Sequence, residues 1–223
     1  MQKIIIIAID GPAASGKSSV AKYLADKLGY LYVDTGAMYR AITYYALLNN
    51  IVENEEAVIE ASKKIDLKLD YKNGITSVFI NGEDVTEKIR THEVNAKVSD
   101  ISRIKDVRAQ LVKLQREFGK NNNLIVEGRD TTTVVFPNAD LKIFLTADAK
   151  ERAKRRHLEF KNKGTDISLD EVEKSILNRD TIDSSRKVSP LTKAEDAIEI
   201  DTTDLTIEQE IEKIVSKVNE LTK

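Results

Sequence analysis

The hydrophobic and polar residues of this chain form two recurring patterns. Short apolar runs are typical of parallel strands buried on both faces, and longer segments with one apolar stripe are typical of amphipathic helices. The apolar runs are Ile4–Ile9, Tyr30–Val33, Leu124–Val126, Leu141–Leu145 and Ala197–Ile200. Helical patterns separate most of these runs, and this alternation predicts an α/β fold with a parallel sheet covered by helices on both faces.

One segment departs from the alternation. Between about residues 66 and 85, short β-prone runs are separated by two Asn-Gly pairs, Asn73-Gly74 and Asn81-Gly82. Because Asn-Gly favours the two-residue turns of antiparallel hairpins, we predict a small antiparallel β-element inserted into the α/β body. A surface hairpin without any role in ligand binding is the alternative interpretation.

The last helix has a well-defined predicted start. Thr206 and Gln209 have the spacing of a capping box, in which each side chain bonds the backbone of the other residue. The apolar stripe that follows consists of Ile207, Ile211, Ile214, Val215 and Val218. This spacing predicts an amphipathic helix that packs against the core by one face.

Composition excludes several classes of protein. The 223 residues suffice for one α/β domain with an insertion, or for two small domains. With no cysteine and two histidines, disulfides, thiolate catalysis and a histidine-rich metal site are excluded. The formal net charge of −2 provides no overall attraction to nucleic acid or membranes. The opening residues are too few for a secretory signal and no apolar stretch is long enough to span a bilayer, so we expect a cytoplasmic protein.

Residues 11–18 read Gly-Pro-Ala-Ala-Ser-Gly-Lys-Ser, the pattern of a phosphate-binding loop. The loop lies between an apolar run and a helix, where its backbone N–H groups and the helix N-terminus can hold phosphates. We expect Lys17 to reach the β- and γ-phosphates of a nucleoside triphosphate and the Ser18 hydroxyl to bind Mg²⁺. An ordinary strand-to-helix turn would explain the glycines but not Lys17 and Ser18. The residues expected to bind the ATP phosphates are Gly11, Pro12, Ala13, Ala14, Ser15, Gly16, Lys17, Ser18 and Ser19.

Three further clusters suit an anionic ligand. They are residues 34–40, residues 127–130, and Arg179 with Asp183 and Arg186, which are spaced to share one helix face. The first two follow apolar runs, and ligands of open α/β sheets bind beyond the carboxyl ends of the strands. The alternatives are a turn with a surface ion pair for the second cluster, and a solvated helix face for the third and for the basic segment Lys150–Lys163.

Arginines from three separate segments exceed what an ATP site needs. Because guanidinium groups bind phosphate bidentately, they indicate a second anionic group, and a nucleoside monophosphate is the favoured acceptor. Its phosphate is already a nucleophilic anion at neutral pH and needs no general base. A hydroxyl acceptor would usually need a carboxylate base, for which Asp34, Asp130 and Asp183 are each candidates.

Several strings of the sequence resemble the bacterial cytidylate kinases, and the resemblance runs nearly end to end. They are IAIDGPAASGKSSVAKYLA, VDTGAMYRA, INGEDVTEKIRTHEVNAKVS, VEGRDTTTVVFPNADLKIFL and NRDTIDSSRKVSPL. The resemblance implies phosphorylation of CMP and dCMP by ATP with Mg²⁺. One departure is the run Thr131-Thr132-Thr133, where the family often has a glycine before its threonine.

The resemblance also implies the domain organisation. Residues 1–223 are expected to form a single kinase with a five-stranded parallel core of the phosphate-loop NTPase type. The core is expected at about residues 1–62, 104–147 and 190–223. The acceptor-binding region would lie at about 35–103, with its small β-insertion at about 66–90, and a lid at about 150–187.

Residue roles follow from the same resemblance. The residues implied as catalytic are Lys17, Arg129 and Arg179. Those implied to bind CMP are Thr35, Tyr39, Arg40, Ser99, Arg108, Arg129, Asp130, Arg179, Asp183 and Arg186. Among them, the implied readers of the cytosine edge are Ser99, Arg108 and Asp130. The implied lid arginines are Arg152, Arg155 and Arg156. Ser18 is the implied Mg²⁺ ligand, with Asp34 a second candidate that acts through water.

Other functions stay open at this point. A shikimate or dephospho-coenzyme A type of kinase would share the scaffold and differ in its acceptor pocket. A nucleotide-binding switch or a non-catalytic nucleotide-binding module is the alternative outside small-molecule kinases. A GTPase would need an Asn-Lys-x-Asp element, which the sequence lacks. We expect ATP and CMP or dCMP as the binding partners, no nucleic acid or membrane partner, and a monomer.

Overall fold

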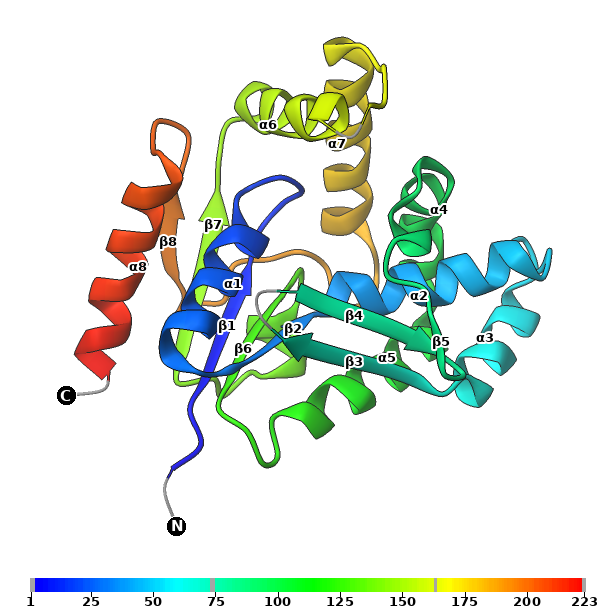
Figure 1. Ribbon diagram of the computed structural model, residues 1–223, viewed down its shortest axis with the longest axis horizontal. Helices are drawn as coiled ribbons and strands as arrows, with labels where there is room; N and C mark the ends of the chain where they lie inside the picture. Colours follow the sequence, from blue (N-terminus) through cyan, green and yellow to red (C-terminus); the bar gives the residue numbers. More distant parts are fainter. Residues whose placement is uncertain (1–2, 73–74, 163, 222–223) are drawn as a thin grey trace.

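A five-stranded parallel sheet runs through the centre of the computed structural model, which describes residues 3–72, 75–162 and 164–221 (Figure 1). Its strand order is β2-β6-β1-β7-β8. The strands are β1 (Ile6–Asp10), β2 (Leu31–Asp34), β6 (Leu124–Gly128), β7 (Leu141–Thr146) and β8 (Ile198–Asp201). Each lies within two residues of a predicted apolar run, so the prediction of an α/β fold with a parallel sheet is confirmed.

Helices cover both faces of this sheet. Ile7 and Ile9 of β1 pack with residues of α1 and α8, whereas Ala8 faces the opposite side and packs near Phe118 of α5. This alternation is the two-residue period of a strand buried on both faces. The helices are α1 (Lys17–Leu28), α2 (Thr35–Leu48), α3 (Glu55–Lys64), α4 (His92–Arg103), α5 (Lys105–Phe118), α6 (Ala149–Asn162), α7 (Leu169–Ser185) and α8 (Ile207–Leu221).

The predicted β-insertion is a separate antiparallel sheet of β3 (Leu67–Lys72), β4 (Ile75–Ile80) and β5 (Glu83–Asp84). Asn81 and Gly82 both have positive φ angles, of 51° and 84°, as expected for the predicted Asn-Gly turn between β4 and β5. The other pair, Asn73-Gly74, lies outside the described residues. The small sheet rests against the β2 edge of the main sheet, where the rings of Tyr32 and Tyr71 meet edge to face.

The capping box of the last helix is confirmed. The Thr206 N–H donates to the Gln209 side chain at 2.9 Å, and the Gln209 N–H lies 3.4 Å from the Thr206 hydroxyl. Ile214 and Val218 are fully buried, but Ile207 is 45% exposed. The predicted apolar stripe is therefore wrong at its first position, because Ile207 lies in the first turn of α8, at the rim of the large cleft described below.

α6 and α7 pack against each other above the carboxyl ends of the strands (Figure 1). α6 confirms the predicted basic helix, although Lys163 lies outside the described residues. α7 ends at Ser185, so Arg186 does not share its face as predicted. The backbone becomes extended at Arg186, and the Leu191 N–H then returns to the Asp183 carbonyl at 2.8 Å.

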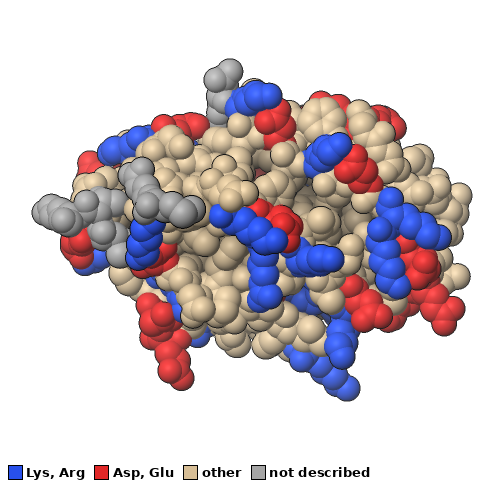
Figure 2. Space-filling model, turned by 90° about the horizontal axis from the view of Figure 1, so that it is seen from below, with Lys and Arg blue, Asp and Glu red and all other residues tan. Residues whose placement is uncertain are grey.

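Charged residues of both signs are interspersed on the face opposite the carboxyl ends of the strands (Figure 2). Such mixing agrees with the formal net charge of −2. None of the helices in the described part of the chain is long and apolar enough to cross a membrane.

Candidate functional site

A cleft of about 560 Å³ opens at the carboxyl ends of β1, β2 and β6. Segments that lie far apart in the sequence contribute its walls. The candidate residues that line it are Ala14, Ser15, Gly16, Lys17, Ser18, Ser19, Asp34, Thr35, Tyr39, Arg40, Arg108, Arg129, Asp130, Arg155, Arg156, Arg179, Asp183 and Arg186. Sequence reasoning therefore selected residues that the fold brings to one place.

The phosphate loop needs glycine at two positions. A Cβ at Gly11, where φ is 154°, would lie 2.0 Å from the Leu145 carbonyl oxygen. Gly16 has a φ of 92°, and a Cβ there would lie 2.5 Å from Oε2 of Glu210 on α8. A side chain at position 11 would push against backbone, and one at position 16 would be strained by the positive φ and would displace the Glu210 carboxylate, so both positions favour glycine.

Lys17 lies inside this loop. Its ammonium donates to the Pro12 carbonyl at 2.6 Å and to the Ser15 hydroxyl at 3.3 Å. The side chain is buried, and this burial, together with the positive charge of Arg129, lowers the pKa of Lys17 to about 7. An anion placed in the loop would restore the charge of Lys17, because it would offset both effects.

Three arginines surround the neighbouring part of the cleft. Arg129 Nε donates to Asp183 Oδ2 at 2.8 Å, and Arg179 Nε lies 3.9 Å from the same oxygen. Burial lowers the pKa of Arg179 to about 9, and the positive charges of Arg129 and Arg40 add to this effect. Arg186 also lies 3.8 Å from Asp183, so three guanidinium groups share one carboxylate, and the cluster retains positive charge that an anionic ligand can neutralise.

The start of α2 fixes the third of these arginines. The Asp34 side chain caps the helix by accepting the Ala37 N–H at 2.9 Å, and its other oxygen accepts from Arg40 at 2.7 Å. Burial raises the pKa of Asp34, but the positive charges of Arg40 and Arg90 and the hydrogen bonds from Ala37 and Arg40 together outweigh burial, and the net shift is downward. Thr35 donates to the Glu127 carbonyl at 2.7 Å, which joins α2 to β6 beneath the cleft.

A buried ion pair forms the far end of the cleft. Arg108 is 2% exposed and donates to Asp130 and to the Ser102 carbonyl. Its guanidinium lies 5.2 Å from the ring centre of Tyr39, within range of a cation–π contact. Arg186 approaches the other Asp130 oxygen at 3.9 Å. A carboxylate and two guanidinium groups therefore face the same space.

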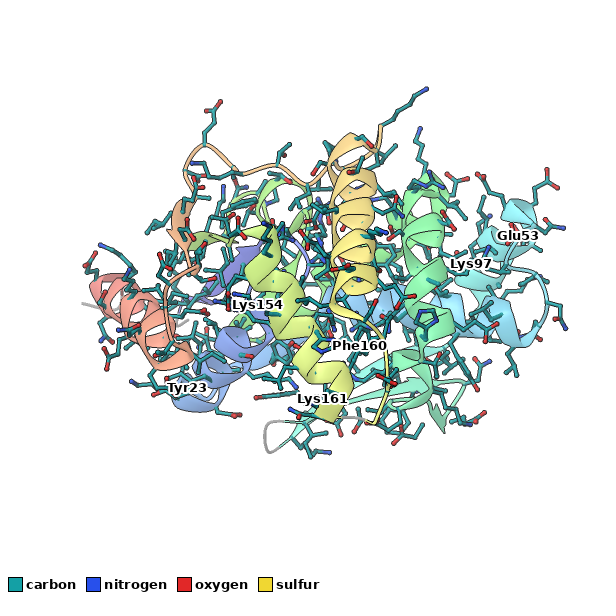
Figure 3. All side chains as sticks on the ribbon, turned by 90° about the horizontal axis from the view of Figure 1, so that it is seen from above. Tyr23, Glu53, Lys97, Lys154, Phe160 and Lys161 are labelled. Carbon is teal, nitrogen blue, oxygen red and sulfur yellow. The ribbon has the colours of Figure 1, made fainter. Side chains whose placement is uncertain are left out.

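Ser99 is placed differently from the other predicted base readers. It lines a neighbouring cavity between α4 and α7, whereas Ser102, one turn later on α4, lines the main cleft. Lys97 of α4 forms an exposed ion pair of 2.5 Å with Glu53, which lies in the segment between α2 and α3; both are labelled in Figure 3.

The three arginines expected on the lid occupy different environments. Arg155 donates to the Thr202 carbonyl at 2.6 Å, and Arg156 pairs with Glu159 at 2.8 Å at the mouth of the cleft. Arg152 is buried below them, donates to the Ala147 carbonyl at 2.9 Å and does not line the cleft.

Sequence reasoning missed the buried carboxylate of Asp10 and named Glu127 only as a member of the cluster at residues 127–130. Asp10 accepts four hydrogen bonds, from the N–H and hydroxyl groups of Thr131 and Thr132, at 2.6 to 2.9 Å. It therefore holds the π-helical turn at Thr131–Val135, directly after Asp130. Glu127 accepts from the Tyr32 hydroxyl and lines the cleft. Their positions at the ends of β1 and β6 were the available signal, since ligands bind at strand ends. Arg90, which also lines the cleft, had no such signal.

The cleft also suits a magnesium ion that arrives with a triphosphate. No group of three or more potential ligands from His, Cys, Asp and Glu gathers among the described residues. Mg²⁺ bound to phosphates needs only one or two protein ligands and keeps several waters. The Ser18 side chain is exposed to the cleft and interacts with Glu127, whose pKa is raised by burial and by the negative charge of Asp34. These residues fit such an ion.

Comparison with known proteins agrees with this geometry. Residues 7–220 match the family described as cytidylate kinase. The chain is 49% identical over 220 residues to a cytidylate kinase of Bacillus cereus (strain ATCC 10987 / NRS 248), with 98% of each chain covered. It is equally similar to a cytidylate kinase of Bacillus thuringiensis (strain Al Hakam), again 49% identical with 98% of each chain covered. An uncharacterized protein from Eubacterium ventriosum shares the fold, with a TM-score of 0.53, 14% identity and coverage of 98% of this chain and 99% of that one.

Proposed function

We propose that this nucleoside-monophosphate kinase, which belongs to the cytidylate kinase family, transfers the γ-phosphoryl group of ATP to CMP and dCMP with the help of Mg²⁺. An oxygen of the acceptor phosphate attacks the γ-phosphorus, the bond to the bridging oxygen of ADP breaks, and CDP or dCDP forms. The cytoplasmic location and the monomeric state stay predictions from the sequence.

The observation that carries the choice of base is the buried pair of Arg108 and Asp130. Nε of Arg108 is buried and donates to no acceptor among the described residues, and it belongs to a side chain that lines the cleft. A carboxylate can accept from the amino group of cytosine, and guanidinium groups can donate to its ring nitrogen and carbonyl. Uracil would present a carbonyl to the Asp130 carboxylate, so such a site disfavours UMP.

The phosphate loop and the arginine cluster supply the groups that phosphoryl transfer needs. Lys17 would bind the β- and γ-phosphates, and their negative charge would raise the lowered pKa of Lys17 so that the side chain is protonated. Arg40, Arg129 and Arg179 would hold the acceptor phosphate and offset the negative charge that two nucleotides bring together. Ser18, with Glu127 or Asp34 acting through water, would hold Mg²⁺, which would supply positive charge to offset the negative charge of the donor phosphates.

The remaining candidate residues have supporting roles in this proposal. Asp183 holds Arg129 and contacts the sugar hydroxyls of CMP, while Thr35 and Tyr39 shape the acceptor pocket. Because Ser99 faces the neighbouring cavity, it would reach the base only if α4 moved toward the main cleft. We propose that α6 and α7 act as the lid that excludes water from the cleft, and that residues 35–103 bind the acceptor.

An ADP-release assay tests this function directly. The purified protein is given ATP, Mg²⁺ and one of CMP, dCMP, UMP, AMP or GMP. We expect turnover with CMP and dCMP that exceeds turnover with UMP by at least tenfold, and loss of turnover when Mg²⁺ is chelated. A Lys17→Met variant is the control for contaminating kinases and should be inactive. Equal rates with CMP and UMP would refute the proposed reading of the base.

A further inference from the structure

Two residues that do not line the cleft hold one residue of the phosphate loop from both sides. The Ala13 N–H donates to Asp180 Oδ1 of α7 at 3.2 Å. The Ala13 carbonyl accepts from Nη1 of Arg152 on α6, also at 3.2 Å. The same Arg152 nitrogen pairs with the other Asp180 oxygen at 2.5 Å. The backbone donor and acceptor of Ala13 are thus both satisfied by the α6–α7 pair.

The next residue of the loop depends on the same contact. Ala14 has a φ of 58°, in the left-handed region that residues with a Cβ rarely adopt. Such a conformation persists where the surroundings hold it. Ala14 also packs against the small apolar cluster of α6 and α7 formed by Ala153, Val172 and Ile176. Figure 3 shows α7 between α6 and α4, and Phe160 of α6, which is labelled there, packs against the same cluster.

Asp180 directly follows Arg179 on α7. Arg179 is one of the three cleft arginines that surround the acceptor phosphate in the proposed function, and its side chain lines the cleft. A contact from Asp180 to the phosphate loop therefore fixes where Arg179 stands relative to the donor phosphates. The Arg152–Asp180 pair is largely buried, with side-chain exposures of 7% and 18%, so solvent does not weaken it as it would a surface pair.

We infer that Asp180 and Arg152 are positioning residues, which hold the phosphate loop in its strained form and set the distance between that loop and Arg179. They act through Ala13 and Arg179 and do not touch the nucleotides. Arginine suits this position because its planar guanidinium donates to the Ala13 carbonyl, the Ala147 carbonyl and the Asp180 carboxylate at once. A lysine ammonium cannot reach all three acceptors in the same geometry. This inference rests on the proposed function only for its effect on turnover.

The test compares Asp180→Asn with Asp196→Asn in the full chain. Asp196 is 68% exposed and pairs with the buried Lys142 at the opposite end of the sheet, so its variant is a control for loss of an aspartate charge away from the cleft. We expect Asp180→Asn to lower kcat with CMP at least tenfold and to raise the KM for ATP severalfold. The KM for CMP should also rise, because Arg179 holds the acceptor phosphate, but the preference for CMP over UMP should stay within twofold, because Arg108 and Asp130 are not involved. Amide exchange at Ala13, followed by NMR, should accelerate at least tenfold.

The outcomes separate this inference from the proposed function. If the wild-type protein phosphorylates no monophosphate, the proposed function fails, and exchange at Ala13 alone decides the inference. If Asp180→Asn keeps kcat within twofold of the wild type, or leaves exchange at Ala13 unchanged, the inference is overturned. Should Asp180→Asn not fold, Arg152→Lys provides the same comparison, since it keeps the charge and loses the fork. The control variant should show none of these changes.

Discussion

Replacing Asp130 by asparagine tests the buried pair at the far end of the cleft. The substitution keeps the shape of the side chain but removes the negative charge that pairs with Arg108, a residue that is only 2% exposed. Loss of one partner of a buried ion pair costs about 3–5 kcal/mol of folding free energy when the remaining charge is left without compensation. The asparagine oxygen still accepts a hydrogen bond, so we expect the lower part of this range. Urea denaturation measures it.

The same substitution should change the choice of base. A hydrogen bond to a charged group contributes about 1.5–3 kcal/mol, which corresponds to about a 10- to 150-fold loss of kcat/KM for CMP. UMP should lose nothing or gain, because the asparagine amide can donate to the uracil carbonyl where Asp130 offers only acceptors. The ratio of kcat/KM for CMP to that for UMP should therefore fall by at least tenfold.

The assay is ADP release at saturating ATP and Mg²⁺, with CMP and UMP varied separately. Asp196→Asn is again a suitable control, since Asp196 lies at the other end of the sheet and its variant should leave the ratio unchanged. An Asp130→Asn protein that folds and keeps the wild-type ratio would contradict our assignment of Asp130 to the cytosine edge.

Three other predictions concern the phosphate loop and the turn beside it. Because burial lowers the pKa of Lys17 to about 7, the Lys17 side chain is mostly neutral at pH 8. ATP binding should raise this pKa, so the protein should take up a proton. Calorimetry in two buffers of different ionisation enthalpy should detect the uptake in the wild type and not in Lys17→Met. Thr132→Val removes one hydroxyl donor from the buried Asp10 carboxylate, so urea denaturation should show a loss of about 1–3 kcal/mol; an unchanged midpoint would mean that this bond contributes nothing. Gly16→Ala should reduce stability and ATP affinity more than Gly82→Ala. Both glycines have positive φ, but only a Cβ at position 16 meets a buried carboxylate. Equal losses in stability would contradict this steric argument.

The sheet and the phosphate loop could be predicted because their signals are local. An apolar run such as Leu141–Leu145 indicates a buried strand by itself, and the loop pattern from Gly11 to Ser18 is contiguous. Positions after apolar runs and on one helix face then pointed to arginines in other segments, the resemblance to the cytidylate kinases implied their roles, and the structure places Arg40, Arg129 and Arg179 around one cleft.

The contacts between distant segments could not be predicted in this way. Asp10 is 121 positions from Thr131, and no periodicity links the two. Arg155 and Arg156 follow Arg152 on α6 by three and four residues, so all three lie on one helix face. Helical spacing therefore cannot tell which of them is buried and which line the cleft. Only the packing of α6 on the phosphate loop buries Arg152 and leaves the other two at the cleft.

Neighbouring strands β1 and β6 end at the same level, with Asp10 opposite Gly128. The phosphate loop follows β1 and Arg129 follows β6, so under the proposed function one ladder of backbone hydrogen bonds sets the distance between the donor loop and an arginine that holds the acceptor. A slip of one residue along that ladder would displace Arg129 by about 3.3 Å relative to the donor. Reacting atoms must come within about 3–3.5 Å of each other, so a slip of this size would be enough to stop the proposed reaction.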